Sequence, residues 1–151
     1  MMAPMLPQAS YNSSRSVLIG ELSPQAVKIL LTAATNVSDG MEWGIGTFLV
    51  MGEAIEPKPT SSFVLRERYV FLHALAPVKD KERLAESIEW TNGILNQMRE
   101  AGLVKANYLA LMAPDLSVEE CFGDEKFERL KALKRKVDPE NVFKHVPAQL
   151  T

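Results

Sequence analysis

The segment from Arg68 to Ala76 most constrains the fold, because its two faces differ in chemistry. Successive residues of a β-strand point to opposite sides of the sheet. One side of this segment is aliphatic and suits packing against helices, with Val70, Leu72, Ala74 and Ala76. The other side carries a phenol and an imidazole among apolar groups, at Tyr69, Phe71, His73 and Leu75. The pattern predicts a strand in a sheet that has helices on one face and a bare second face.

The periodicity of the remaining chain predicts two more strands and three helices. Strands are expected over about 42–51 and 104–113, and helices from Pro24 to about 36, over about 81–101 and over 124–137. The order α-β-β-α-β-α favours an α+β fold, a plait-like antiparallel sheet of about three strands backed by helices. A bare sheet face of this kind needs cover, so we expect a dimer partner or a ligand on it.

Each predicted helix has an apolar stripe that we expect to face the sheet. The three stripes comprise Val27, Leu30, Leu31 and Ala34; Leu84, Ile88, Thr91, Leu95 and Met98; and Phe127, Leu130, Leu133 and Val137.

The ends of the chain lack periodicity. We expect a flexible tail over residues 1–16, with a short extended segment at 17–19, one domain over 17–146 and a second tail over 147–151. Gly44 and Gly46 lie inside the first predicted strand. Glycine there marks either a bulge or a gap where another group comes close, and the sequence leaves both interpretations open.

Composition excludes several classes of function. A net charge of −2 argues against a nucleic-acid partner, which requires a concentrated basic surface. No apolar run is long enough to span a membrane, and the N-terminal residues lack the features of a signal peptide. The single cysteine, Cys121, excludes an internal disulfide and fits a reducing, cytoplasmic location. With His73 and His145 far apart in sequence, we expect no metal site.

Two blocks of sequence resemble a known family. Residues 122–131, FGDEKFERLK, run into 134–143, KRKVDPENVF, and keep the spacing of a turn, a helix, an Asp-Pro break and a Phe anchor. A second block joins Pro59, Ser62, Phe63, Arg66 and Tyr69 to His73. Together they resemble the C-terminal part of berberine-bridge-type FAD-linked oxidases. The resemblance covers roughly residues 20–146.

The resemblance implies a fold and a role. In that family one domain binds FAD, and an antiparallel sheet backed by helices roofs the flavin and forms the substrate pocket. Residues 17–146 would be a berberine-like, substrate-binding domain present without the FAD-binding domain. We expect no cofactor for the chain alone, and FAD only where a partner domain supplies its site, because no glycine-rich phosphate loop occurs in the sequence.

Three departures from the family pattern concern polar groups near the flavin. The family's strand asparagine falls near Leu111 or Met112, so it is either lost or replaced by a shifted Asn107. The tyrosines of two other motifs are replaced by Phe122 and Val137. These changes are what loss of flavin chemistry would produce.

The candidate catalytic residues are His73, Tyr69 and Tyr108. His73 is a general base suited to neutral pH, Tyr69 would line the same pocket, and Tyr108 would donate to a substrate oxygen. A core histidine with a satisfied ring is the simpler interpretation of His73, and a sheet-packing aromatic is the simpler interpretation of Tyr108. The substrate-binding candidates, for which core or surface roles are the alternative, are Trp43, Phe71, Arg66, Met112 and Phe122.

Three functions remain open. The first is acid–base chemistry of isomerase or cyclase type on an apolar intermediate of secondary metabolism, by a homodimer that has lost the flavin. The second is an FAD-linked oxidoreductase component that needs a separate FAD-binding chain. The third is a non-enzymatic accessory protein or a decayed remnant. The bare aromatic sheet face favours the first.

Overall fold

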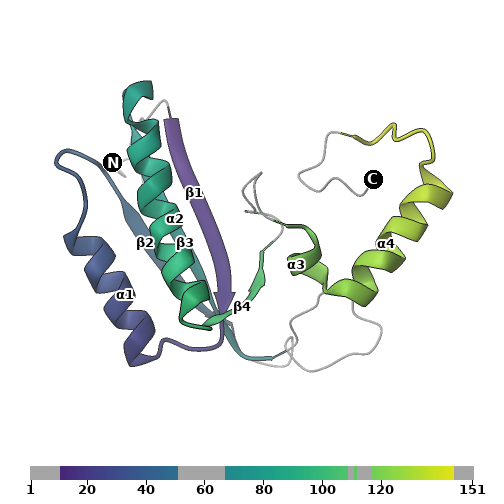
Figure 1. Cartoon of the computed structure of the whole chain (residues 1–151), viewed down its shortest axis with the longest axis horizontal. Helices are drawn as coiled ribbons and strands as arrows, with labels where there is room; N and C mark the ends of the chain where they lie inside the picture. The colour runs from purple at the N-terminus through teal and green to yellow at the C-terminus, as the bar shows by residue number, and fades with distance from the viewer. Residues whose placement is uncertain (1–10, 51–66, 109–110, 112–116, 145–151) are drawn as a thin grey trace, which may run out of the picture.

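The computed structural model describes residues 11–50, 67–108, 111 and 117–144 (Figure 1). A short 3-10 turn, Lys81–Arg83, leads into the helix that begins at Leu84. The elements are β1 (Tyr11–Ile19), α1 (Pro24–Thr35), β2 (Gly44–Val50), β3 (Tyr69–Val78), α2 (Leu84–Glu100), β4 (Val104–Asn107), α3 (Glu119–Phe122) and α4 (Asp124–Val137).

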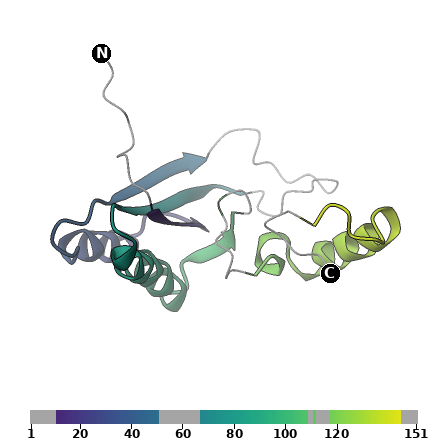
Figure 2. The same ribbon diagram turned by 90° about the horizontal axis from the view of Figure 1, so that it is seen from above.

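The strands form one antiparallel sheet in the order β2-β3-β1-β4. Helices α1 and α2 lie on the same side of it (Figure 2). The predicted α+β class is therefore confirmed, with four strands in place of about three. The helix-covered face holds the main core, and the aliphatic side of β3 faces it as predicted. This core comprises Val17, Ile19, Val70, Leu72 and Ala74 from the sheet, with Ala26, Ile29, Ala33, Ile94, Leu95 and Met98 from the helices.

Strand β1 is the main difference from the prediction. Residues 11–16, expected in a flexible tail, pair in register with β3 along the first part of β1. Their polar side chains bind α2 across the core: Ser13 Oγ lies 2.6 Å from Thr91 Oγ1, and Arg15 Nε donates to Asn92 Oδ1 at 2.6 Å. The buried side chains in this part of β1 are polar, so the sequence shows no apolar periodicity. The prediction of a flexible tail was therefore wrong for residues 11–16.

Helix α1 begins as predicted, because Ser23 Oγ accepts a hydrogen bond from the Ala26 backbone N–H and Pro24 stands in the first turn. Its buried face differs from the expected stripe and consists of Ala26, Ile29 and Ala33. Leu31 is exposed. The predicted and the observed stripes of α1 are offset by one residue. The observed stripe contains two alanines, and these small side chains allow the helix to approach the sheet closely.

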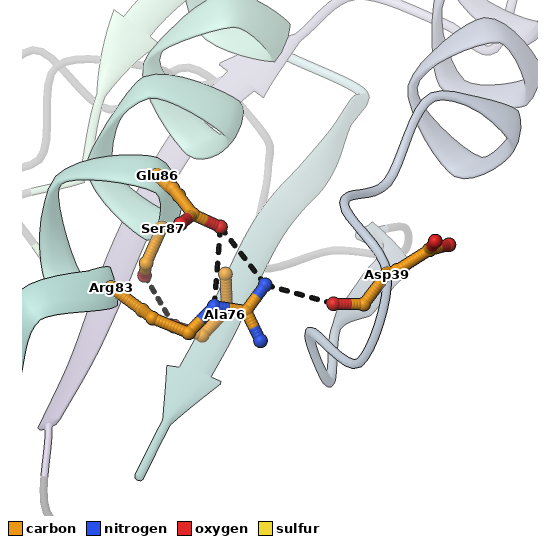
Figure 3. Close-up of polar contacts among 5 residues, drawn as sticks. All are labelled: Asp39, Ala76, Arg83, Glu86 and Ser87. Carbon is orange, nitrogen blue, oxygen red and sulfur yellow. Dashed lines mark hydrogen bonds and ion pairs between the residues drawn. The ribbon is translucent and has the colours of Figure 1, made fainter. Parts of the chain in front are cut away.

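Helix α2 also turns slightly from its expected orientation. Ser87 is fully buried and donates its hydroxyl to the Ala76 carbonyl of β3 (Figure 3). Ile88, the next residue, is exposed. Just before the helix, Arg83 Nη2 donates to Glu86 Oε2 and to the Asp39 carbonyl, both at 2.9 Å (Figure 3). These bonds join the start of α2 to the loop that follows α1.

The C-terminal third departs most from the expected packing. Strand β4 ends at Asn107, because the chain turns at Tyr108, whose carbonyl accepts from the Leu111 N–H at 3.2 Å. Helix α4 lies beside the sheet, away from α1 and α2 (Figure 1). It has no buried residue, and Leu133 and Val137 of its expected inward stripe are exposed. In the described part of the chain, no second layer covers that stripe.

Candidate functional site

The candidate site lies on the sheet face opposite α1 and α2. We call this the aromatic face, after Phe48 on β2, Tyr69 and Phe71 on β3, and Tyr108 just after β4. Backbone pairing places Phe48 directly opposite Phe71. The same alternation places His73 on this face, one pleat beyond Phe71. The sequence prediction that these β3 side chains share one face therefore holds.

Ring contacts join three of the predicted residues. The Phe71 ring centroid lies 5.2 Å from that of Tyr108 in an edge-to-face arrangement, and 6.1 Å from the His73 ring. Phe48 lies 5.9 Å from Phe71 on the other side. Separations of this size are favourable for aromatic pairs. The structure thus brings His73, Phe71 and Tyr108 together around one centre, with Tyr69 further along the same strand.

His73 is held by a hydrogen bond across the sheet. Its Nε2 lies 2.8 Å from Ser14 Oγ of β1. Partial burial lowers the pKa of the imidazole below its ordinary value, because burial disfavours the charged form. At neutral pH the ring is therefore neutral, and a neutral imidazole can accept a proton.

The two glycines of β2 form no bulge. The β2–β3 register runs without a shift from Gly44 to Val50. Gly46 is directly opposite His73, and Gly44 is opposite Leu75. A Cβ atom on Gly44 would meet nothing within 4 Å, whereas one on Gly46 would touch the Phe48 ring at 3.4 Å. The bulge interpretation was wrong, and the strand leaves open space above Gly44, near His73.

Other predicted residues lie elsewhere. Trp43 packs against Trp90 of α2 with ring centroids 5.8 Å apart, and Trp90 donates to the Ala33 carbonyl of α1, so this pair belongs to the helix side. Phe122 ends α3 and is half-buried. Arg66 and Met112 lie outside the described residues.

Asn107, considered above as a shifted family asparagine, is fully engaged. Its Oδ1 accepts from Arg99 Nη2 at 3.1 Å, and its Nδ2 donates to Glu120 Oε2 at 2.5 Å. Only 3% of the residue is exposed. Asn107 therefore joins α2 and α3 to the end of β4. The sequence did not predict this role, because hydrophobic periodicity does not show that Arg99 and Glu120 lie next to Asn107.

The Asp-Pro turn after α4 is preorganised. Asp138 accepts from the backbone N–H groups of Val142 and Phe143 at 2.7 and 3.1 Å, and it pairs with Lys134. The hydrogen bond from Lys134 is the main cause that lowers the pKa of the Asp138 carboxyl, with help from the two backbone donors and against the effect of burial. The turn leaves Phe143 75% exposed. It therefore presents an aromatic side chain outward on a fixed backbone.

Neither a metal site nor a membrane-spanning helix is found in the described part of the chain. No three His, Cys, Asp or Glu residues there gather in a way that would hold a metal ion. No described helix combines the length and the apolar character needed to cross a bilayer.

The described residues do not fit the phosphate-binding part of an FAD site. A pyrophosphate is typically bound by a glycine-rich turn at a helix N-terminus. Helix α1 begins at Pro24, and the Ser23 hydroxyl already caps it. Helix α4 follows Gly123, but its first turn carries the carboxylates of Asp124 and Glu125, which repel a phosphate. Gly44 and Gly46 lie in a regular strand and not in a turn. No step through FAD follows from these residues.

Comparison with known proteins agrees with the sequence resemblance. The family model described as "Berberine and berberine like" matches residues 107–148. The FAD-linked oxidoreductase aurO of Gibberella zeae is 25% identical over 139 residues, which is 91% of this chain. The resemblance to the berberine-like region is confirmed. The chain spans 27% of the length of that relative.

Solved structures share the fold of this chain. The wild-type BBE-like 1 protein of Physcomitrella patens gives a TM-score of 0.76 at 16% identity, covering 93% of this chain and 30% of its own. Aclacinomycin oxidoreductase gives 0.73 at 13% identity, covering 89% and 31%. The carbohydrate oxidase of Microdochium nivale gives 0.70 at 19% identity, covering 91% and 32%. At these identities the likeness establishes the fold alone.

Proposed function

We propose that the chain binds an apolar small molecule of secondary metabolism on its aromatic face and acts on it by non-redox acid–base chemistry. The observation that supports this most is the position of His73. Its neutral imidazole lies between an aromatic centre, Phe71 with Tyr108, and the open space above Gly44. A ligand seated there would meet an apolar surface and one proton acceptor.

The proposed reaction is an isomerisation or a cyclisation. His73 takes a proton from a carbon next to a carbonyl group, and the electron pair moves onto the carbonyl oxygen. Tyr108 donates a hydrogen bond to that oxygen. In an isomerisation the electron pair returns from the oxygen to re-form the carbonyl group, and the same proton goes to another carbon. In a cyclisation the enolate carbon bonds to a second carbonyl carbon of the same molecule, whose π electrons move onto its oxygen, and that oxygen takes the proton. Neither route needs an oxidant or a reductant. Tyr69 and Phe48 extend the apolar surface, and a second copy of the chain covers the rest of the face.

A simple ketone tests this chemistry without knowledge of the natural substrate. β-Tetralone, an apolar aromatic ketone, would be incubated with the protein in deuterium oxide, and deuterium uptake next to the carbonyl followed by NMR. We expect the exchange to be roughly a hundredfold faster with the wild type than with His73→Gln, the size of a general-base contribution. Equal rates with both proteins would contradict the proposal.

A second candidate is an FAD-linked oxidoreductase component whose FAD is held by a partner domain. Two observations favour it: the exposed stripe of α4, and the fixed turn that presents Phe143, both of which suit docking on a larger body. The relative aurO, of which this chain spans 27%, is FAD-linked. The visible spectrum of the purified chain, before and after soaking with FAD and desalting, is a one-sided test, because both functions predict a colourless chain when the partner is absent. A flavin band that survives desalting would favour this second function.

A further inference from the structure

We infer that Ser14 is a positioning residue for His73: it binds Nε2 of the imidazole and so leaves Nδ1 as the ring nitrogen available to a ligand. The inference rests on the proposed function, because it specifies which nitrogen acts as the base. Its physical basis is a side-chain bond of 2.8 Å between neighbouring strands, joining residues 59 positions apart in sequence.

Strand register brings two serines of β1 near His73, and the other contact of Ser16 explains why Ser14 makes this bond. Ser16 is directly opposite His73, and Ser14 is opposite Leu75. The hydroxyl of Ser16, however, is fully buried and donates to the Leu111 carbonyl at 3.2 Å. Ser14 therefore reaches His73 diagonally, and no other hydrogen bond of its side chain is found within the described residues. The two serines of β1 on this face have separate roles.

The bond matters because a neutral imidazole carries one N–H and one lone pair. A hydrogen bond at one ring nitrogen decides the role of the other. A serine hydroxyl can accept from an Nε2–H or donate to an unprotonated Nε2, and the role of base requires the first arrangement. In it, Nε2 carries the proton and donates to Ser14 Oγ, and Nδ1 keeps the lone pair that a general base requires. The Ser14 hydroxyl proton then stays free for water or for a ligand oxygen. Without Ser14, both tautomers would be populated and a fraction of the protein would present an N–H in place of a base.

Three matched variants separate positioning from packing. Ser14→Ala removes the hydroxyl. Ser14→Thr keeps it and adds a methyl group that a strand accommodates well. Ser16→Ala removes the other hydroxyl of the same strand face and leaves the bond to His73 intact. If Ser14 acted only in packing, Ser14→Ala and Ser16→Ala would have the same effect on the tautomer of His73.

The readout is the tautomer of His73 in the full chain, from long-range proton–nitrogen NMR spectra of isotope-labelled protein near neutral pH. His73→Gln assigns the signal, since the chain has two histidines. We expect the wild type, Ser14→Thr and Ser16→Ala to show a single tautomer protonated at Nε2. Ser14→Ala should show averaged nitrogen shifts and a severalfold slower β-tetralone exchange. An unchanged spectrum in Ser14→Ala, or a wild-type ring protonated at Nδ1, would overturn the inference.

The same variants separate this inference from the proposed function. If the tautomer depends on Ser14 but His73→Gln leaves β-tetralone exchange unchanged, the positioning role stands and the proposed chemistry fails. If the exchange depends on His73 while the tautomer ignores Ser14, the chemistry stands and the positioning role fails.

Discussion

At the scale of single residues, the buried imidazole of His73 couples stability to pH. Burial lowers its pKa in the folded state, whereas the unfolded chain titrates near about 6.5. Below that value the unfolded state binds more protons, so the free energy of unfolding falls as pH drops toward the lowered folded pKa and is fully retained above about 6.5. The decrease equals the extra free energy needed to protonate a partly buried imidazole.

His73→Gln removes this titration while it keeps a polar side chain of similar reach. We expect its free energy of unfolding to fall less than that of the wild type between about pH 7.5 and about pH 5. Urea unfolding curves at several pH values measure the difference, and His145→Gln serves as the histidine control. Parallel curves for the wild type and His73→Gln would show that the imidazole titrates alike in both states.

At the scale of elements, Gly44 of β2 and Gly93 of α2 allow an effect on stability to be separated from an effect on ligand binding. Gly44 has ordinary strand geometry, and a side chain there would meet nothing within 4 Å. Gly44→Val should therefore raise stability by roughly 0.5–1 kcal/mol, because valine favours strands. It should also slow β-tetralone exchange, because it fills the space near His73. Gly93→Ala in α2, also without close neighbours, should stabilise by about 1 kcal/mol and leave exchange unchanged.

The polar contact between β1 and α2 is the second test at this scale. Ser13 and Thr91 are buried, and their hydroxyl oxygens lie 2.6 Å apart. Thr91→Val keeps the shape but leaves the Ser13 hydroxyl unsatisfied, which should cost about 1–3 kcal/mol. Adding Ser13→Ala should recover part of that loss. A double-mutant cycle in urea measures the coupling, and strictly additive effects would mean that the hydroxyl bond adds nothing.

This contact also shows where sequence reasoning ends. Periodicity located α1, α2, α4, β2 and β3, and the alternation in β3 gave both faces of the sheet, because these signals are local and apolar. Thr91 was correctly placed in the buried stripe of α2. Its partner Ser13 was assigned to a tail, because a polar strand becomes recognisable only once its bonds to another element are known. The pairing of His73 with Ser14 depends on the same strand and could not be predicted without it.

At the scale of the whole molecule, two apolar surfaces compete as the site of association. One is the aromatic face, where Phe48 is 61% exposed, and the other is the α4 stripe, where Leu133 is 53% exposed. Surfaces of this kind mark interaction sites. The proposed homodimer uses the aromatic face, so Phe48→Ser should convert a dimer to a monomer, as measured by light scattering on a sizing column.

Leu133→Ser and Leu31→Ser provide the comparison, since Leu31 on α1 is 63% accessible and so at least as exposed as Leu133. Neither should change the mass if the aromatic face forms the dimer. Loss of the dimer in Leu133→Ser alone would move the interface to α4, and the part of the aromatic face around the ligand would then be open to a flavin-bearing partner. A wild type that is already monomeric would remove the homodimer from the proposed function, and the two exposed surfaces would then favour docking on a different chain.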